Sequence, residues 1–252
     1  MNKSLVAVIA LLGTTALASA ADLPAAPYTK APAPIAVYDW SGFYIGINGG
    51  GATSHNCWAL NNDGITGAGP LAPAVGEGCH DATGGLVGGQ VGYRWQSAEW
   101  VFGVEAQGDW ADLSGSNTSL FYGPGFINQS RTDAIGLFTG QVGYAWNNVL
   151  LYVKGGAAVT DNKYSGIVGA LELDQSNNNT YWGGAVGAGI EVGFGPNWSV
   201  AAEYDHLFMG NQNVNFNFVG GGPSRSDNIR QDIDMATVRL NYRFGGPVIA
   251  RY

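Results

Sequence analysis

The sequence contains little charge, few cysteines and none of the common catalytic motifs. Only 12% of its 252 residues are charged, about half the share found in an ordinary soluble domain. The net charge of −8 argues against nucleic acid as a partner, because nucleic-acid binding requires a basic surface. The chain has no Walker loop, no dinucleotide-binding fingerprint, no zinc-protease motif and no nucleophile elbow. We therefore expect no catalytic residue, no metal and no cofactor, and the chain is not expected to be an enzyme.

The first twenty residues have the pattern of a secretory signal peptide. Lys3 supplies a positive charge, residues 5–16 are apolar, and residues 18–20 read Ala-Ser-Ala, a typical cleavage site. The apolar run is shorter than the roughly 20 residues that a membrane-spanning helix needs, so an uncleaved anchor is the weaker alternative. Residues 21–39 are rich in Pro and Ala, which favours an extended linker.

Glycine and aromatic residues are abundant in the exported part. The chain has 40 Gly, 12 Tyr, 10 Phe and 8 Trp, but no apolar stretch after Ala20 approaches the length of a membrane helix. The one membrane-spanning structure open to such a chain is a closed β-barrel, in which every backbone polar group is paired. A secreted β-sandwich is the alternative, and the strand pattern has to distinguish the two.

A strand–turn–strand unit repeats along the chain. The segment GLVGGQVGYRW at 85–95 recurs as GLFTGQVGYAW at 136–146, and looser copies end at Phe194 and Phe244. Each of the first three copies is followed by a short turn and another strand. This alternation predicts an all-β, eight-stranded antiparallel transmembrane barrel with short periplasmic turns and long extracellular loops. The expected strands are 40–53, 84–96, 100–112, 132–146, 149–161, 180–194, 198–210 and 232–244, and the expected long loops are 54–83, 113–131, 162–179 and 211–231.

Alternation within the strands predicts a lipid-facing exterior and a charged lumen. Phe102 and Val104 share one face of their strand, and Glu105 and Asp109 share the other. The residues expected to line the lumen are Arg94, Glu105, Asp109, Lys154, Glu191, Glu203, Asp205, Arg239 and Arg243. Two interpretations remain open for them. They form a hydrogen-bonded plug, because a barrel of this size is just wide enough to be filled by side chains, or they line a narrow polar path for ions or small solutes.

The two cysteines, Cys57 and Cys79, both lie in the first expected long loop. In an oxidising compartment such a pair is expected to form a disulfide, whereas a zinc site would need both sulfurs as thiolates. His55 and His80 flank the pair in the sequence. A second hypothesis is therefore a loop site in which both imidazoles bind haem or a metal.

Several short motifs resemble one family of proteins. The segment DWSGFYIG at 39–46, the Gly-Tyr-x-Trp strand ends and the segment NYRF at 241–244 resemble the small porin-family, opacity-like outer-membrane barrels of Gram-negative bacteria. The resemblance covers residues 39–244 and the signal peptide. It implies an eight-stranded barrel in the cell outer membrane, surrounded by outer-membrane lipid, with antigenic surface loops and a role in envelope integrity. Some relatives are described as porins and some as haem-binding surface proteins.

The C-terminus departs from the family pattern. Barrel chains of this kind commonly end on the aromatic residue of the last strand, which acts as a signal to the barrel-assembly machinery after escort by periplasmic chaperones. Here an extension, residues 245–252, follows the barrel at 40–244, so either Phe244 or Tyr252 carries that signal. The expected function is a structural, envelope-integrity or porin-like role, and the alternative is a surface receptor for haem. The oligomeric state is open.

Overall fold

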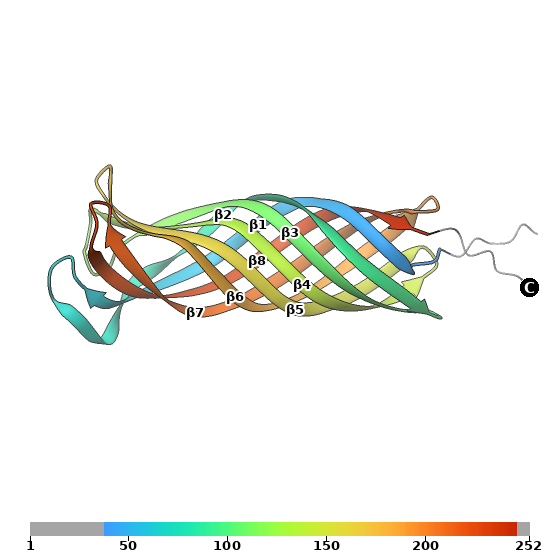
Figure 1. Cartoon of the computed structure of the whole chain (residues 1–252), viewed down its shortest axis with the longest axis horizontal. Coiled ribbons are helices and arrows are strands. Elements are labelled where there is room, and N and C mark those ends of the chain that lie inside the picture. The colour runs from blue at the N-terminus through green and yellow to red at the C-terminus, as the bar shows by residue number, and fades with distance from the viewer. Residues whose placement is uncertain (1–37, 246–252) are drawn as a thin grey trace, which may run out of the picture. The chain divides into compact units, whose positions relative to one another are not determined.

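In the computed structural model, residues 38–245 form eight strands that close into one antiparallel barrel (Figure 1). The structure describes these residues except for the side chains of 177 and 178. The expected signal peptide, nearly all of the linker, Tyr252 and the rest of the extension after 245 lie outside the described residues. The strands are β1 (Gly42–Asp63), β2 (Gly69–Ser97), β3 (Trp100–Thr118), β4 (Phe126–Trp146), β5 (Val149–Val168), β6 (Leu171–Phe194), β7 (Trp198–Phe218) and β8 (Pro223–Phe244).

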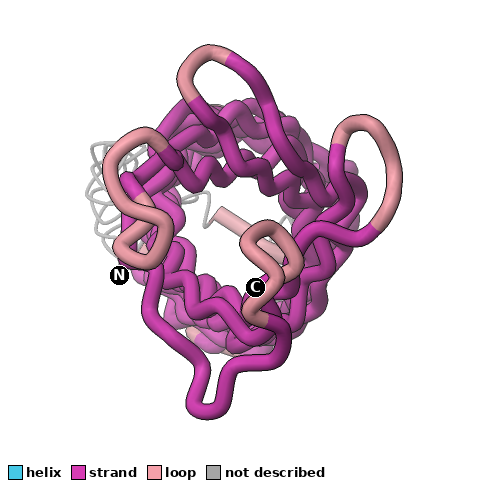
Figure 2. The backbone as a smooth tube through the Cα atoms, turned by 90° about the vertical axis from the view of Figure 1, so that its left-hand side faces the viewer, coloured by secondary structure: helices cyan, strands magenta, loops and turns pink. Residues whose placement is uncertain are grey.

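The barrel closes because β1 pairs on both sides. Phe43 lies opposite Tyr93 of β2 and opposite Phe244 of β8, and every other strand pairs with its neighbours in sequence. Closure gives every strand a hydrogen-bonded neighbour on both sides, which satisfies the backbone groups of the paired segments. The predicted fold class is confirmed. The open centre of the ring in Figure 2 is filled by side chains, many of them fully buried.

Short turns lie at the end of the barrel where β1 begins and β8 ends (Figure 1), which we call the turn end. Residues 98–99, 147–148 and 195–197 connect the strands there. Ala98, Asn147 and Gly195 have φ of 54°, 55° and 66°. Tight hairpins need such left-handed residues because their backbone twist then matches that of the strands, and Asn and Gly adopt them most readily.

The opposite end, which we call the hairpin end, differs from the prediction. The four segments expected to be long loops are mostly strand, and the connections there are only 64–68, 119–125, 169–170 and 219–222. β7 shows why the sequence misled. Up to Phe208 the large apolar side chains of β7 other than Leu207 point outwards, but beyond Gly210 its asparagines point outwards and Val214 and Phe216 point inwards. A strand with a polar outer face resembles a loop in composition, although its period-two alternation continues.

The outer face of the turn-end section carries a continuous apolar band. At the turn end the band is bordered by an aromatic girdle whose rings are exposed and lie beside the turns. These rings include Tyr93, Trp95, Trp100, Tyr144, Trp146, Phe194, Trp198 and Phe244. Trp110 and Trp182, which are 77% and 60% exposed, mark the edge of the band on the hairpin side. Aromatic girdles at both edges of an apolar band are typical of barrels that cross a bilayer. Within residues 38–245 no helix is long and apolar enough to cross a membrane.

Candidate functional site

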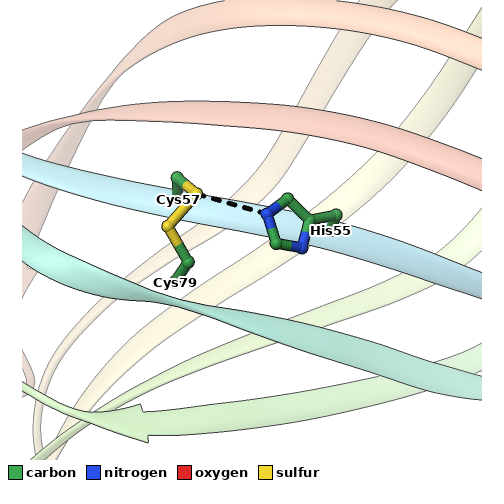
Figure 3. A group of neighbouring side chains, drawn as sticks. All are labelled: His55, Cys57 and Cys79. Atoms are coloured by element: carbon green, nitrogen blue, oxygen red, sulfur yellow. Dashed lines mark hydrogen bonds between the residues drawn. A yellow bond between two sulfur atoms is a disulfide. The ribbon is translucent and has the colours of Figure 1, made fainter.

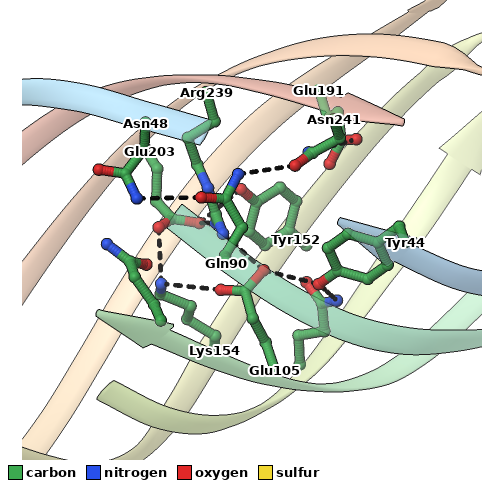
Figure 4. A network of polar contacts seen from close by, with 12 residues as sticks. Tyr44, Asn48, Gln90, Glu105, Tyr152, Lys154, Glu191, Glu203, Arg239 and Asn241 are labelled. Carbon is green, nitrogen blue, oxygen red and sulfur yellow. Dashed lines mark hydrogen bonds and ion pairs between the residues drawn. The ribbon is translucent and has the colours of Figure 1, made fainter. Parts of the chain in front are cut away.

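The centre of the turn-end section holds a buried cluster of five charged side chains. Figure 4 shows Glu105, Lys154, Glu203 and Arg239 of this cluster. Lys154 Nζ lies 2.6 Å from Glu203, 3.2 Å from Asp205 and 3.6 Å from Glu105. Arg239 bridges the two glutamates, with one nitrogen 2.5 Å from Glu105 and the other bonded to Glu203. Two cations therefore face three carboxylates, and each charge has opposite charges beside it, as burial requires.

Two tyrosines complete this cluster, and the sequence did not identify them. The hydroxyls of Tyr44 and Tyr152 donate hydrogen bonds of 2.6 Å to Glu105 and Glu203, respectively. Both rings are buried in the lumen. Their inward position in the alternation of β1 and β5 was the available signal, but the set of residues expected to line the lumen contains charged side chains alone. The tyrosines fill space beside the charges and satisfy carboxylate oxygens.

A second ion pair lies closer to the turn end. Arg94 Nη2 is 2.8 Å from Glu191 Oε2, both side chains are almost completely buried, and the Arg94 guanidinium lies 4.3 Å from the centre of the Tyr44 ring. A cation over an aromatic face is attracted by the ring quadrupole. Arg243 forms the end of the series, with one nitrogen 3.9 Å from Asp39 and hydrogen bonds to backbone carbonyls.

All nine residues predicted to line the lumen point inwards. The structure brings five of them into the central cluster, pairs Arg94 with Glu191 and places Arg243 at the turn end. The ninth, Asp109, accepts a hydrogen bond of 2.8 Å from Gln107. The chemistry of the set is electrostatic neutralisation within a narrow interior.

An aliphatic layer crosses the lumen on the hairpin side of these charges. The order along β1 shows its place, because the inward residues run from Tyr44 through Asn48 and Ala52 to Trp58, and Ala52 belongs to the layer. The other members are Ala82, Leu86, Leu113, Ile135, Leu137, Ala158, Ala185, Leu207, Met209, Ile233 and Met235. Each is at most 7% exposed. Water does not reach a layer packed in this way, so the lumen is closed at this level.

A layer of hydroxyl and amide groups follows on the hairpin side. Gln231 Nε2 donates to Ser54 Oγ at 3.0 Å and to Asn162 Oδ1 at 3.1 Å, and Thr132 Oγ1 donates to Asn162 Oδ1 at 2.7 Å. His80 lies in the same region, with ring nitrogens 2.7 Å from Asn117 Oδ1 and 2.9 Å from Ser130 Oγ. These mutual hydrogen bonds satisfy neutral polar groups that water does not reach.

A cation near the hairpin end was missed by the sequence reasoning. Arg225 is fully buried and contacts Glu77 at 2.8 Å, Asp174 at 3.0 Å and Asp227 at 3.3 Å. Its guanidinium also lies 4.6 Å from the centre of the Phe216 ring. All these positions fell in segments interpreted as loops. The alternation of Asn with Val214 and Phe216 was the signal that could have placed them on inward-facing strand positions.

The connection 119–125 covers this cluster. The Tyr122 hydroxyl donates a 2.9 Å hydrogen bond to Asp63 Oδ1, and Arg225 lies 5.9 Å from the centre of the Tyr122 ring. Partial burial and the neighbouring Asp63 carboxylate raise the pKa of Tyr122, because both disfavour a phenolate. The phenol therefore stays protonated and keeps its hydrogen bond.

The cysteines lie in the barrel wall, which corrects the expectation that they lie in a loop. Cys57 of β1 and Cys79 of β2 are opposite each other in the ladder, and their sulfurs are bonded at 2.00 Å. The two-histidine site is also corrected. Because Asn56 is the residue opposite His80, His55 and His80 point to opposite faces of the sheet. His55 is exposed outside and His80 is buried in the lumen, so they do not bind one ligand together.

Comparisons with known proteins agree with this architecture. Residues 6–244 match the family model described as outer membrane protein beta-barrel domain. The chain is 28% identical to the 31 kDa outer-membrane immunogenic protein of Brucella melitensis over 260 residues, covering 97% of this chain and 100% of that protein. It is 31% identical to the 22 kDa outer membrane protein of Rhizobium leguminosarum bv. viciae over 167 residues, covering 66% of this chain and 62% of that protein.

A solved structure shares the fold. The outer membrane protein OprG from Pseudomonas aeruginosa superimposes with a TM-score of 0.50, at 13% sequence identity, covering 83% of this chain and 100% of that chain. At this identity the likeness concerns the fold alone. Together with the matched family and the named relatives, it places the apolar band in the outer membrane.

Proposed function

Because this chain belongs to the outer membrane protein beta-barrel domain family, we propose that it is an outer-membrane barrel with a closed lumen and a structural role in the envelope. The aliphatic layer is the observation that carries this proposal. Its members come from all eight strands, and it separates the charged cluster from the polar groups on the hairpin side. An ion passing it would have to give up its hydration shell among alkyl side chains, which is costly.

The charged cluster supports the same role. In a pore, lining charges are hydrated, contribute little to stability and determine ion selectivity. Here Lys154 and Arg239 are each about 1% exposed and lie between carboxylates, an arrangement that cross-links four strands through side chains. The cluster acts as an electrostatic tie within the barrel and leaves few free charges to attract a solute.

The hairpin end is the part of the barrel that faces the cell exterior, since short turns in such barrels face the periplasm. Its outer surface is polar, and the relative from Brucella is named an immunogenic protein. We infer that this chain also presents its hairpin end as a surface antigen. A haem site formed by His55 and His80 is not proposed, because the two side chains point to opposite faces.

Phe244 is placed where it can act as the assembly signal. It is the last residue of β8, faces outwards and lies opposite Phe43 at the closing seam, with ring centres 5.7 Å apart. An aromatic residue at that position can be presented to the assembly machinery before β1 and β8 pair.

Conductance of purified, refolded protein in a planar bilayer tests the closed lumen. We expect no discrete current steps from the wild type. Leu137→Ala removes side-chain volume from the aliphatic layer and should introduce a leak, whereas Leu151→Ala, a lipid-facing change on the neighbouring strand, should stay silent. Discrete wild-type steps that scale with salt, and whose ion selectivity changes in Arg239→Ala, would contradict the proposal and support a porin-like role.

A further inference from the structure

On the outer face of the barrel, an imidazole lies between a carboxylate and the disulfide. Figure 3 shows the imidazole, His55, beside Cys57 and Cys79. His55 and Asp81 are opposite each other in the β1–β2 ladder, and so are Cys57 and Cys79 two positions further along. Alternation places all four side chains on the same face. They are therefore held together by the strand register, which the closed barrel fixes.

Asp81 orients the imidazole of His55. The Asp81 Oδ1 atom lies 2.6 Å from His55 Nδ1, which favours the tautomer whose Nδ1–H donates to the carboxylate. The lone pair of Nε2 is then free, and this atom lies 3.4 Å from Cys57 Sγ. A carboxylate that holds one ring nitrogen while the other faces a ligand position is the arrangement found around metal-bound histidines.

The distances fit a tetrahedral metal site. Zinc binds thiolate sulfur at about 2.3 Å and imidazole nitrogen at about 2.0 Å, which places two such ligand atoms roughly 3.5 Å apart in a tetrahedron. The observed separation of Nε2 and Sγ is 3.4 Å. Within the described part of the chain, His55, Cys57 and Cys79 are the one group of three metal-binding residue types whose ligand atoms all lie within 4.8 Å of one another.

We propose that reduction of the disulfide converts this patch into a binding site for a thiophilic divalent cation of the Zn²⁺ class. A dithiol reductant transfers two electrons and two protons, becomes a cyclic disulfide and leaves Cys57 and Cys79 as thiols. Binding then releases both thiol protons to solvent, and the cation takes two thiolates and His55 Nε2, with water as the fourth ligand. The two thiolates neutralise the dication.

The surroundings allow an aqueous cation to reach the site. The side chains of His55 and Asp81 are 55% and 57% exposed. On the other side of β1, the residue of β8 opposite His55 is Asp232, which forms an ion pair with the exposed Arg230. These charged residues lie on the hairpin side of the apolar band. The site therefore faces water at the outer edge of the membrane, where both a reductant and a metal ion have access.

Cobalt binding to the full protein refolded in detergent tests the proposal, because Co²⁺ bound to thiolates gives charge-transfer absorption and tetrahedral Co²⁺ gives strong visible bands. After reduction with a phosphine, which takes an oxygen atom from water as it becomes the phosphine oxide, the wild type should show both signals and lose them on addition of Zn²⁺. The oxidised protein should show neither. The double variant Cys57→Ser/Cys79→Ser should also show neither while it remains folded.

Three single variants separate binding from positioning. His55→Ala removes a ligand and should weaken Co²⁺ binding by at least about 100-fold, and Asp81→Asn should weaken it about 10–100-fold, as loss of a supporting partner typically does. His80→Ala is the matched control, because His80 follows Cys79 in sequence but points into the lumen. Reduced wild type that binds no more Co²⁺ than the double Cys→Ser variant would overturn the proposal, and so would His80→Ala weakening binding as much as His55→Ala.

Discussion

The two sections of the barrel use one β-sheet in opposite ways. In the turn-end section of β7, Val200 and Phe208 face outwards while Glu203 and Asp205 are buried in the lumen. In the hairpin-end section the same strand turns Asn215 outwards and buries the aromatic Phe216. The pairing of β7 with β8 continues through both sections. We infer that the surrounding medium determines which face is apolar, with lipid around the turn-end section and water around the hairpin-end section.

The charges inside the two sections also differ. The turn-end cluster sets two cations against three carboxylates, whereas at the hairpin end the buried Arg225 lies among Glu77, Asp174 and Asp227. In the hairpin section aromatic rings do more of the packing, since Trp58 has Tyr164 and Phe216 as ring neighbours at 5.5 and 5.6 Å. Buried ion pairs are more numerous in the turn-end interior, and contacts between aromatic rings are more numerous in the hairpin-end interior.

The largest expected effect comes from breaking the central charge cluster. Arg239→Ala leaves Glu105 and Glu203 without the cation that bridges them, and breaking a buried ion pair typically costs about 3–5 kcal/mol because the remaining charge is uncompensated. We expect the free energy of unfolding to fall by that amount in urea titrations of the protein folded in lipid vesicles.

The matched control lies on the same strand. Arg230 is 66% exposed on the outer face and pairs with Asp232 at 3.3 Å. Exposed pairs contribute about 0–1 kcal/mol, so Arg230→Ala should change the unfolding midpoint little. Equal losses for both arginines would mean that the interior charges are hydrated, and the contrast between the two faces would fail.

The turn-end section was the part that the sequence could predict. Residues such as Arg94 and Arg239 each stand between outward apolar neighbours in a repeated segment, so their face follows from period-two alternation alone. The cysteine pair was correctly matched, but its place in a loop was wrong. Beyond residue 53 the outward side chains of β1 change from apolar to polar, so the pattern of a lipid-facing strand ends there.

The inward or outward position of individual hairpin-end residues could not be predicted in the same way. His55 and His80 are both close to a cysteine in sequence, yet the register that puts Asn56 opposite His80 sends them to opposite faces. The register of these residues depends on the pairing of the whole of β1 with β2 and on the bulges between residues 58 and 62, which lie between them and the connection 64–68. The carboxylate partners of Arg225 could be recognised only once its side chain was known to point into the lumen.

A second prediction concerns the packed interior of the hairpin end. Phe216→Ala removes a ring that contacts Trp58 and the Arg225 guanidinium. We expect a loss of about 3 kcal/mol, the lower end of the range for Phe→Ala, since side chains near an open end relax more readily into the cavity. Asn215→Ala, one residue away and exposed, should fall within about 0.5 kcal/mol of the wild type. Protease resistance of the hairpin end in intact vesicles measures the local effect, and similar digestion of both variants would count against a packed outer interior.

The smallest of the three effects tests the position of the lipid boundary. Val153 faces outwards on β5, between the turn-end girdle and Trp182, and an arginine on the lipid face near the midplane costs about 2–3 kcal/mol. We therefore expect Val153→Arg to lower the free energy of unfolding by that amount. Asn215→Arg introduces an arginine on the outer face of the hairpin-end section, which meets water, and should cost no more than about 0.5 kcal/mol. Urea unfolding from lipid vesicles compares the two variants directly. A cost for Asn215→Arg as large as that for Val153→Arg would place the hairpin-end section within the hydrocarbon, and the inversion of the two faces would then need another cause than the change from lipid to water.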